Sequence, residues 1–309
     1  MGKHSSVLFK AGDYLHPRFW PMWLTFALLR LVTLLPYRAC MAVGRFLGQL
    51  AYYFTASRQR VTDINLERCF PDKSAAERKR IKLECHRNLG VSLIEMAMCW
   101  WWPASRFEPL VEIRGREHLD AVLASGRGAI LLTGHYTSLE IGGRLLTLYT
   151  PLQGMYRTQR NAMFDSYLYT RRRSYLVDII SRKYTRQLIR GIRQQIPTWY
   201  APDQDFRRER NVFAPFFGIA TATITASSRM AQAANAVMLP YYPERKADGS
   251  GYLLHICPPL PNVPSDDEIA DASAINRSIE EWVRRFPGNY MWMLRRFRTR
   301  PPGEAPFYP

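Results

Sequence analysis

The sequence predicts an α/β protein with a mostly parallel sheet flanked by helices, preceded by an N-terminal membrane-anchoring helix. Short strand-like runs alternate with helical patterns over residues 111–286, which is typical of parallel strands connected by helices. The run at 128–133 (GAILLT) is apolar throughout, as expected for a strand buried on both faces. The tract at 19–36 is also apolar, with Arg30 as its one interior charge. With 309 residues, 47% hydrophobic and 22% charged, the chain can bury a large core, and overall disorder is excluded.

The tract at 19–36 is the candidate for a single transmembrane helix. Its length of about 18 residues is borderline for a hydrocarbon layer of about 30 Å, and the alternative is an amphipathic helix buried in the globule. Several arginines follow this tract within residues 38–60. If the tract spans the membrane, the tendency of positive charge to stay on the cytoplasmic side would leave the rest of the chain in the cytosol. Residues 39–54 are apolar but interrupted by polar residues and glycines, and they predict an interfacial or re-entrant helix. We therefore expect residues 1–60 to form a membrane-anchoring segment and residues 61–309 a cytosolic α/β domain.

The remaining elements are predicted from local signals. Ser74 and Glu77 have the S-x-x-E spacing of a capping box, and an apolar pattern of helical period continues to Pro103, so one long helix is predicted there. Further strands are expected at 111–113, 128–133, 153–156, 198–201, 237–242 and 252–257. Further helices are expected at 118–124, from 138, within the basic region 163–193, at 227–236 and at 274–286.

Positive charge is concentrated in three windows of the chain. Lys and Arg number 43 against 26 Asp and Glu, which gives a formal net charge of +17 at pH 7. The net charge is +7 in residues 1–60, +8 in residues 156–215 and +6 in residues 282–300. Such windows suit an anionic partner. Aromatic residues gather in apolar runs such as 100–102 rather than alternating with basic residues, which disfavours a nucleic-acid-binding or other non-enzymatic polyanion-binding protein.

The five cysteines are odd in number and contain no C-x-x-C pair, so neither a disulfide framework nor a zinc site is predicted. We expect them to be reduced thiols. No Cys or Ser has a sequence neighbour that would activate it as a covalent nucleophile. The sequence predicts no metal and no other cofactor.

His135 is the most informative candidate for chemistry. It follows the apolar strand 128–133, and open α/β sheets gather their ligands at the carboxyl ends of strands. Glu140 could orient the imidazole if His135 lies in the turn and Glu140 in the first turn of the next helix. An imidazole oriented by a carboxylate can act as a general base towards a substrate hydroxyl. The alternative is that residues 137–140 are only a T-x-x-E capping box, in which the carboxylate satisfies a backbone N–H.

Two further segments carry candidate residues. Asp203 and Asp205 follow the predicted strand 198–201, and three arginines stand in a row at 171–173. The aspartates could instead be turn formers, and the arginines a solvated surface. The D-x-D pattern could also hold a divalent metal, as in glycosyltransferases, although His135 has no evident role in that chemistry.

Taken together, these residues resemble the late acyltransferases of lipid A biosynthesis, in their lauroyltransferase branch. That family lies within the wider glycerophosphate-type acyltransferases, which share an H-x4-D/E motif. Leu294 is one departure, because the family usually has His at that position before the paired arginines. The resemblance covers nearly the whole chain, and its motifs are 15–20 (LHPRFW), 65–71 (NLERCFP), 135–140 (H-x4-E), 156–157 (YR), 171–173 (RRR), 199–203 (WYAPD), 290–292 (YMW) and 295–301 (RRFRTRP).

The resemblance implies roles for individual residues. His135 is expected to be the catalytic base, Glu140 its partner, and Asp203 a strand-end carboxylate needed for activity. The expected fold is that of the glycerophosphate-type acyltransferases. The arginines expected to contact the anionic substrate are Arg157, Arg171, Arg172 and Arg173.

The resemblance also implies a reaction. A fatty acyl chain, lauroyl or similar, is expected to pass from acyl-acyl carrier protein to a hydroxyl on a hydroxyacyl chain of a Kdo-bearing lipid A precursor. The expected location is the cell inner membrane, with the catalytic domain facing the cytoplasm and without a nucleic-acid partner. We expect direct attack on the thioester without an acyl-enzyme. The alternative is a sister acyltransferase that acts on a lysophospholipid or another glycolipid.

Overall fold

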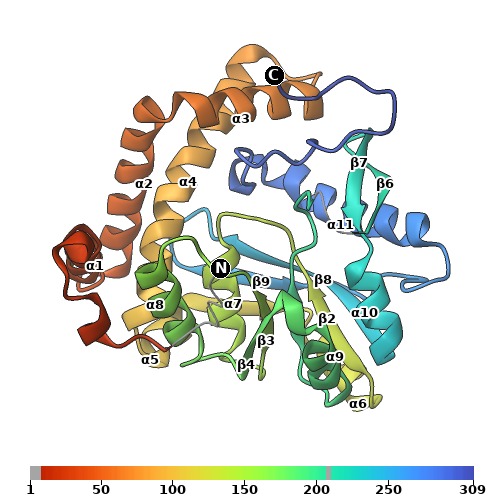
Figure 1. The fold of residues 1–309 in the computed structure, drawn as a ribbon, viewed down its shortest axis with the longest axis horizontal. Helices are drawn as coiled ribbons and strands as arrows, with labels where there is room; N and C mark the ends of the chain where they lie inside the picture. The colour runs from red at the N-terminus through yellow and green to blue at the C-terminus, as the bar shows by residue number, and fades with distance from the viewer. Residues whose placement is uncertain (1–7, 207–209) are drawn as a thin grey trace.

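The computed structural model describes residues 8–206 and 210–309. Figure 1 shows a central sheet with helices on both of its sides, so the predicted α/β architecture is confirmed. The strands of this sheet are β1 (Val111–Arg114), β2 (Gly128–Leu132), β3 (Gln153–Tyr156), β4 (Asp178–Ser181), β5 (Thr198–Tyr200), β8 (Ala236–Arg245) and β9 (Tyr252–Ile256). They lie in the order β1-β9-β8-β2-β5-β3-β4. The sheet is mostly parallel, as predicted, because β8 and β9 form its one antiparallel pair.

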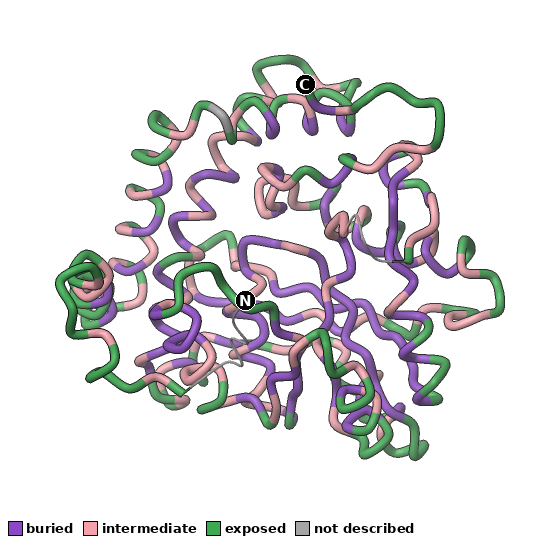
Figure 2. Tube along the Cα trace, in the orientation of Figure 1, coloured by how far each residue is buried: buried purple, intermediate pink, exposed green. Residues whose placement is uncertain are grey.

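The two faces of the sheet bury two separate apolar cores. Ala129 and Leu131 of β2 face one core, whereas Ile130 and Leu132 face the other, as the period of two in a strand requires. Figure 2 shows the central strands buried along their length. Helices α4, α7 and α8 contribute to the first core, and α9, α10 and α11 to the second. The α-helices are α1 (Trp20–Val32), α2 (Tyr37–Phe54), α3 (Ala56–Cys69), α4 (Ala75–Trp101), α5 (Ala104–Phe107), α6 (Arg116–Ala124), α7 (Leu139–Leu146), α8 (Ala162–Arg172), α9 (Thr185–Arg193), α10 (Ala226–Ala234) and α11 (Glu268–Arg285).

Side-chain caps determine where two of the long helices begin. The capping box predicted at the start of α4 is confirmed: the Ser74 hydroxyl accepts the backbone N–H of Glu77, and the Glu77 carboxylate accepts that of Ser74 at 2.8 Å. Helix α11 begins earlier than the predicted residue 274. The Asp267 side chain accepts two backbone N–H groups of the first turn of α11, so the cap lies upstream of the apolar pattern.

A strand and a hairpin are among the features of the fold that were not predicted. The basic region 163–193 is not one helical stretch, because β4 lies between α8 and α9. A separate antiparallel hairpin is formed by β6 (Asn211–Phe216) and β7 (Ile219–Ile224). Its turn places Phe217 and Gly218 at positive φ angles of 53° and 74°. Phenylalanine is an unusual residue for such a turn, so the sequence carries only a weak hairpin signal there.

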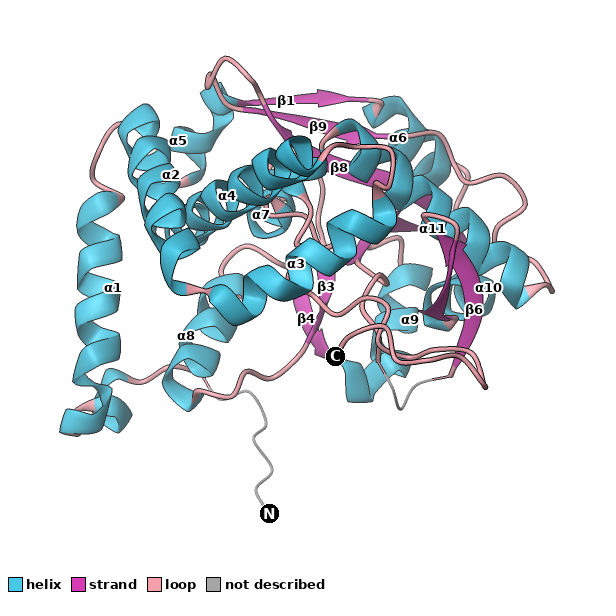
Figure 3. Cartoon of the chain, turned by 90° about the horizontal axis from the view of Figure 1, so that it is seen from above, coloured by secondary structure: helices cyan, strands magenta, loops and turns pink. Residues whose placement is uncertain are grey.

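The helix predicted over 19–36 is shorter in the structure, because a turn at residues 33–36 separates α1 from α2. Helix α1 has 13 residues and α2 has 18. Within the part of the chain that is described, no helix combines the length and the apolar character needed to cross a membrane. Figure 3 shows α1 at the edge of the molecule, beside α2.

Glycines allow α2 to pack closely against α4. A Cβ atom added at Gly90 of α4 would lie 2.1 Å from the carbonyl oxygen of Gly44 and 2.4 Å from the backbone nitrogen of Gly48. Both contacts are to helix backbone, which cannot move aside without separating the two helices. The N-terminal helices are thereby held on the α/β body, and an ion pair between Arg45 and Glu84 at 2.7 Å adds to this contact.

We expect Gly90→Ala to destabilise the protein by about 1–3 kcal/mol, the usual cost of overpacking. The added methyl group has no space between the two helix backbones. Chemical denaturation in detergent would measure the change. The matched control is Gly12→Ala, because a Cβ atom at Gly12 meets no atom within 4 Å. Equal stability of the two variants would contradict the close packing.

Candidate active site

His135 and Asp203 form a hydrogen-bonded pair at the carboxyl edge of the sheet. His135 follows β2 and Asp203 follows β5, and because these two strands are parallel neighbours their carboxyl ends lie together. The Nδ1 atom of His135 is 2.5 Å from Oδ1 of Asp203. The backbone N–H of His135 also donates to Oδ2 of Asp203 at 2.8 Å. The carboxylate therefore fixes both the ring and the backbone of His135.

The Asp203 carboxylate is buried and has a third donor. Only 2% of the residue is exposed, and the Tyr290 hydroxyl donates to Oδ2 at 2.9 Å. Burial raises the pKa of Asp203, but the charge of His135 and the hydrogen bonds from it lower the pKa by more, so the net pKa is below its ordinary value. Asp203 is therefore ionised at neutral pH. An ionised carboxylate at Nδ1 places the ring proton there and leaves Nε2 to accept a proton.

Glu140 has different partners from the one predicted. Its carboxylate accepts the Nε–H of Arg172 at 3.0 Å and an Nη2–H of the same guanidinium, and the Tyr175 hydroxyl donates to it at 3.0 Å. The pairing of His135 with Glu140 is thus corrected: the carboxylate that orients His135 is Asp203. The capping-box alternative is not found either, because α7 has no side-chain cap and the Thr137 hydroxyl accepts a hydrogen bond from Arg245.

The Glu140–Arg172 pair is largely buried, with 13% and 19% of the two side chains exposed. Burial raises the pKa of Glu140, but Arg172 and the Tyr175 hydroxyl lower it by more, so the net pKa is below its ordinary value. Burial lowers the pKa of Arg172, yet the charge of Glu140 raises it by more. Both groups are therefore charged at neutral pH, and the bidentate contact fixes the direction of the guanidinium.

The D-x-D pattern is divided between two partners. Asp203 pairs with His135, whereas Asp205 accepts hydrogen bonds from the backbone N–H and the hydroxyl of Thr299, at 2.6 and 2.9 Å. Asp205 thus joins the segment after β5 to the C-terminal segment. The two carboxylates point to different groups and do not converge as they would on one metal ion.

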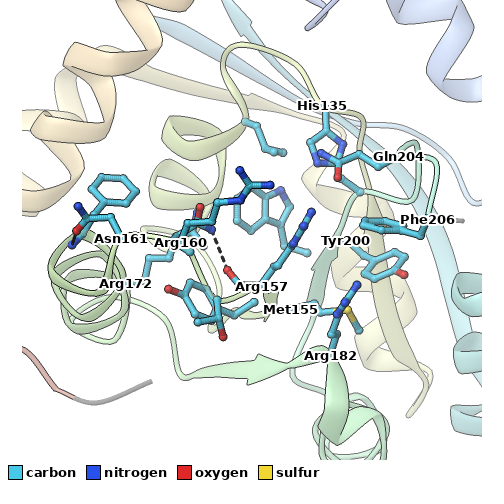
Figure 4. Close-up of a pocket in the computed structure, with 17 residues that line it drawn as sticks. His135, Met155, Arg157, Arg160, Asn161, Arg172, Arg182, Tyr200, Gln204 and Phe206 are labelled. Atoms are coloured by element: carbon cyan, nitrogen blue, oxygen red, sulfur yellow. Dashed lines mark hydrogen bonds between the residues drawn. The ribbon is translucent and has the colours of Figure 1, made fainter. Parts of the chain in front are cut away.

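A cavity of about 670 Å³ opens beside His135 (Figure 4). Among the described residues that line it, none is Asp or Glu, and none is Cys or Ser. The apolar and aromatic part of the lining is made by Leu139, Met155, Tyr156, Phe164, Trp199, Tyr200, Ala201 and Phe206. The polar part is made by His135, Arg157, Thr158, Gln159, Arg160, Asn161, Arg172, Arg182 and Gln204.

The predicted arginines differ in where they lie. Arg157 and Arg172 line the cavity. Arg171 instead donates to the Tyr167 hydroxyl at 2.9 Å, and the Arg173 guanidinium lies 5.9 Å from the centre of the Tyr169 ring, so the structure places both outside the cavity. Sequence reasoning missed two arginines of the lining, which are Arg160 and Arg182. Each follows a strand end, β3 or β4, and that position was the available signal.

Arg245 holds the loop that carries His135. Its guanidinium donates to the hydroxyl and the carbonyl oxygen of Thr137, both at 2.9 Å. The same guanidinium contacts both carboxylate oxygens of Glu95 at 2.7 Å, and Tyr252 donates to Glu95 at 2.9 Å. Glu95 lies on α4 and is fully buried. The long helix is thus connected through Arg245 to the backbone two residues after His135.

We expect Glu95→Gln to lower the free energy of unfolding by about 3–5 kcal/mol, because it leaves the buried Arg245 guanidinium without its charged partner. Thermal or chemical unfolding would measure the loss. The matched control is Glu112→Gln, since Glu112 pairs with Lys246 through a side chain that is 60% exposed. Exposed pairs contribute about 0–1 kcal/mol. A loss at Glu95 no larger than at Glu112 would contradict this role.

Comparison with known proteins identifies the family of the chain. The model of the family described as bacterial lipid A biosynthesis acyltransferase matches residues 9–299, and the chain belongs to this family. It is therefore an acyltransferase of lipid A biosynthesis, and the resemblance found in its motifs is confirmed.

Three proteins of Escherichia coli (strain K12) are similar to it over almost their full length. The chain is 36% identical to the lipid A biosynthesis lauroyltransferase, covering 95% of this chain and 96% of that protein. It is 35% identical to the palmitoleoyltransferase, covering 96% and 97%. It is 28% identical to the myristoyltransferase, covering 96% and 92%.

Proposed function

We propose that this acyltransferase moves a fatty acyl chain, lauroyl or similar, from acyl-acyl carrier protein to a hydroxyl on a hydroxyacyl chain of a Kdo-bearing lipid A precursor. The observation that carries the proposal is the His135–Asp203 pair beside a cavity that is part apolar and part lined by arginines. The apolar lining suits an acyl chain, and the arginines suit an anionic head group. Two relatives are a lauroyltransferase and a palmitoleoyltransferase, and these names agree with a long acyl chain.

His135 is the general base of the proposed reaction. Its Nε2 accepts the proton of the acceptor hydroxyl, and the oxygen attacks the thioester carbonyl. The C–S bond then breaks, and the thiolate of the carrier arm leaves with the proton that the imidazolium returns. Asp203 keeps the ring in the required tautomer and stabilises the imidazolium while it exists. Such acid–base assistance typically contributes about 10²- to 10⁴-fold in rate.

Direct attack needs no covalent intermediate on the protein. None of the residues lining the described cavity is Cys or Ser. The thiols elsewhere are poor nucleophiles: burial, for example, raises the pKa of Cys85 to about 12. The acyl group therefore passes directly from the carrier to the acceptor in this proposal.

Glu140 and Arg172 position the substrate in this proposal. The Arg172 guanidinium lines the same cavity as His135, and Glu140 fixes its direction through two parallel hydrogen bonds. Arg172, together with Arg157, contacts the anionic part of a bound substrate. Glu140 acts through Arg172 and has no contact with the reacting atoms.

The decisive experiment for the function has two parts. Lipid A from cells that lack the protein should miss one secondary acyl chain, which returns when the gene is restored, as mass spectrometry would show. The purified protein should acylate the Kdo-bearing precursor with acyl-acyl carrier protein, and its own mass should not change with the donor alone. Unchanged lipid A would refute the function, and an acyl group retained on the protein would refute direct attack. A preference for lysophospholipid in the same assay would favour the sister activity.

Attachment to the inner membrane, with the catalytic domain on the cytoplasmic side, completes the proposal. Trp20, Leu24, Leu28 and Leu31 recur at helical spacing on α1 and are 54–62% exposed. There is no Asp or Glu between residues 13 and 63, so this region matches an anionic lipid surface. The exposed large apolar side chains of α2 continue the apolar surface; they are Phe46, Leu50, Tyr53 and Phe54.

We expect the double variant Leu24→Asp/Leu28→Asp to bind vesicles containing anionic phospholipid at least about tenfold more weakly, because each buried leucine contributes about 1.5–3 kcal/mol. Co-sedimentation would measure binding. The matched control is Val177→Asp/Ile269→Asp, at exposed apolar residues outside α1 and α2. If both double variants bind like the unmodified protein, the face on α1 is not the attachment surface.

A further inference from the structure

The C-terminal segment 289–299 contacts the loop that carries His135. The Thr137 N–H donates to the carbonyl oxygen of Asn289 at 2.7 Å. The Met291 N–H donates to the carbonyl oxygen of His135 at 3.0 Å. The segment itself contributes no residue to the described lining of the cavity. It therefore supports the backbone of His135 without touching the space in which the substrates bind.

The same segment holds both aspartates that follow β5. The Tyr290 side chain is buried, with 2% of the residue exposed, and its hydroxyl donates to Oδ2 of Asp203 at 2.9 Å. At the other end of the segment, Thr299 donates through its backbone N–H and its hydroxyl to Asp205, at 2.6 and 2.9 Å. The segment thus fixes the position of the carboxylate that orients His135.

Arg296 anchors the segment through neutral partners. The residue is 2% exposed. Its guanidinium donates to the carbonyl oxygen of Ala222 at 2.6 Å, to the Thr223 hydroxyl at 3.1 Å and to the side-chain oxygen of Asn276 at 3.2 Å. No carboxylate of residues 8–206 and 210–309 forms an ion pair with it. Burying a charge without an opposite charge in contact is costly, so its presence there indicates a role beyond packing.

The positive charge of Arg296 acts on the Asp203 carboxylate. The guanidinium lies 5.6 Å from the centre of the Phe216 ring, and that ring lies 6.1 Å from the ring of Tyr290. Burial raises the pKa of Asp203, whereas the charge of His135 and the hydrogen bonds from it lower the pKa, and the charge of Arg296 lowers it further. Arg296 therefore stabilises the ionised form of Asp203 as well as anchoring the segment.

We infer that Tyr290 and Arg296 are positioning residues of the acyl transfer, because Tyr290 fixes the Asp203 carboxylate and Arg296 anchors the segment and stabilises the charge of that carboxylate. This role rests on the proposed role of the His135–Asp203 pair. Neither Tyr290 nor Arg296 lines the described cavity, so their effect passes through Asp203. It therefore falls on the chemical step, in which the imidazole must stay aligned with the acceptor hydroxyl.

Tyr290→Phe removes only the hydroxyl and should lower kcat about tenfold, the size expected for one hydrogen bond to a charged group. KM for both substrates should stay nearly unchanged. The matched control is Tyr308→Phe, because the Tyr308 hydroxyl is also buried in the C-terminal region but donates to Asn65 at 2.7 Å. Steady-state kinetics of acyl transfer to the Kdo-bearing precursor would compare the two, with thermal unfolding to confirm that both are folded. No loss of kcat in Tyr290→Phe, or an equal loss in Tyr308→Phe, would overturn the inference.

A double-mutant cycle tests whether Tyr290 acts through Asp203. If it does, Asp203→Asn/Tyr290→Phe should be at most about twofold slower than Asp203→Asn, because the carboxylate that the hydroxyl fixes is already gone. A further tenfold loss would show that Tyr290 acts elsewhere and would overturn the inference. If Asp203→Asn lowers kcat but Tyr290→Phe does not, the inference fails and the proposed function stands. If Asp203→Asn keeps a normal kcat, the proposed role of the pair fails, and the inference fails with it.

The role of Arg296 is tested with two substitutions that differ in charge. Arg296→Gln should lower kcat without raising KM, and Arg296→Lys, which keeps the charge, should retain more turnover. The matched control is Arg300→Gln, since the Arg300 guanidinium donates to the carbonyl oxygen of Ala220 at 2.7 Å but belongs to a different ion pair, with Glu304. A normal kcat in Arg296→Gln, or equal losses in Arg296→Gln and Arg300→Gln, would refute the role of Arg296. The Tyr290 cycle decides the inference if neither Arg296 variant folds.

Discussion

Replacing Asp203 with Asn is expected to lower kcat about 10²- to 10⁴-fold, with KM for either substrate nearly unchanged. The Asp203 carboxylate accepts hydrogen bonds from the ring and the backbone of His135. An amide that donates to Nδ1 instead would leave the ring proton on Nε2, where it blocks proton removal from the acceptor hydroxyl. The loss appears in the chemical step because Asp203 is not itself among the described residues that line the cavity and acts on the reaction through His135.

Asp205→Asn is the matched control. It is the same substitution two residues away, but Asp205 contacts Thr299 rather than His135. We expect it to keep near-normal turnover. Steady-state kinetics of both variants, with thermal unfolding to confirm that each is folded, would check this. Should Asp203→Asn keep more than about a tenth of the normal kcat, the role given to the His135–Asp203 pair is wrong.

Glu140→Gln is expected to lower both stability and activity. Removing one partner of a buried ion pair costs about 3–5 kcal/mol, because the Arg172 guanidinium is left unpaired. If the guanidinium that positions the substrate is displaced by about 1 Å, the reaction rate falls by as much as about 10²-fold. The double variant Glu140→Gln/Arg172→Met removes both charges, so it should regain much of the stability while its turnover stays low. Recovery of turnover with stability would contradict a substrate-positioning role for Arg172.

The stability effect of Glu140→Gln should also depend on pH. The pKa of Glu140 is lower in the folded protein than its ordinary value of about 4.3, so its stabilising effect is fully present above that value. It is lost as the pH falls through the lowered folded pKa. The difference in unfolding free energy between the variant and the unmodified protein should therefore be constant near neutral pH and shrink below about pH 4. A difference that does not change with pH would mean that the carboxylate charge is not its cause.

The strand that precedes His135 could be predicted well, because β2 is a short apolar run with turn residues after it. His135 and Asp203 were both placed after strands, where the structure has them. Element β4 could not be found, because four residues between two basic helices show no clear period of two. The lining arginines Arg160 and Arg182 were missed because neither belongs to a motif, although each follows the end of a strand.

The pairing of charges was the part that sequence reasoning got wrong. Glu140 is five positions after His135, so the two were expected to interact, whereas Asp203 is 68 positions after His135. The order of strands in the sheet determines which carboxylate reaches His135. Strand β5 lies directly beside β2, although β3 and β4 come between them along the chain. Glu140, in the first turn of α7, meets Arg172 of α8 instead.

By itself, the sequence determined the family, the α/β class, the long capped helix and the residue types available for catalysis. These properties depend on local composition, on the periodicity of apolar residues and on the order of motifs along the chain. Only the tertiary structure decided which carboxylate orients His135, which arginines line the cavity, and that α2 packs through glycines against α4. The physical reason is the order of strands in the sheet together with the direction in which each helix presents its side chains, and both depend on contacts between residues far apart in the chain.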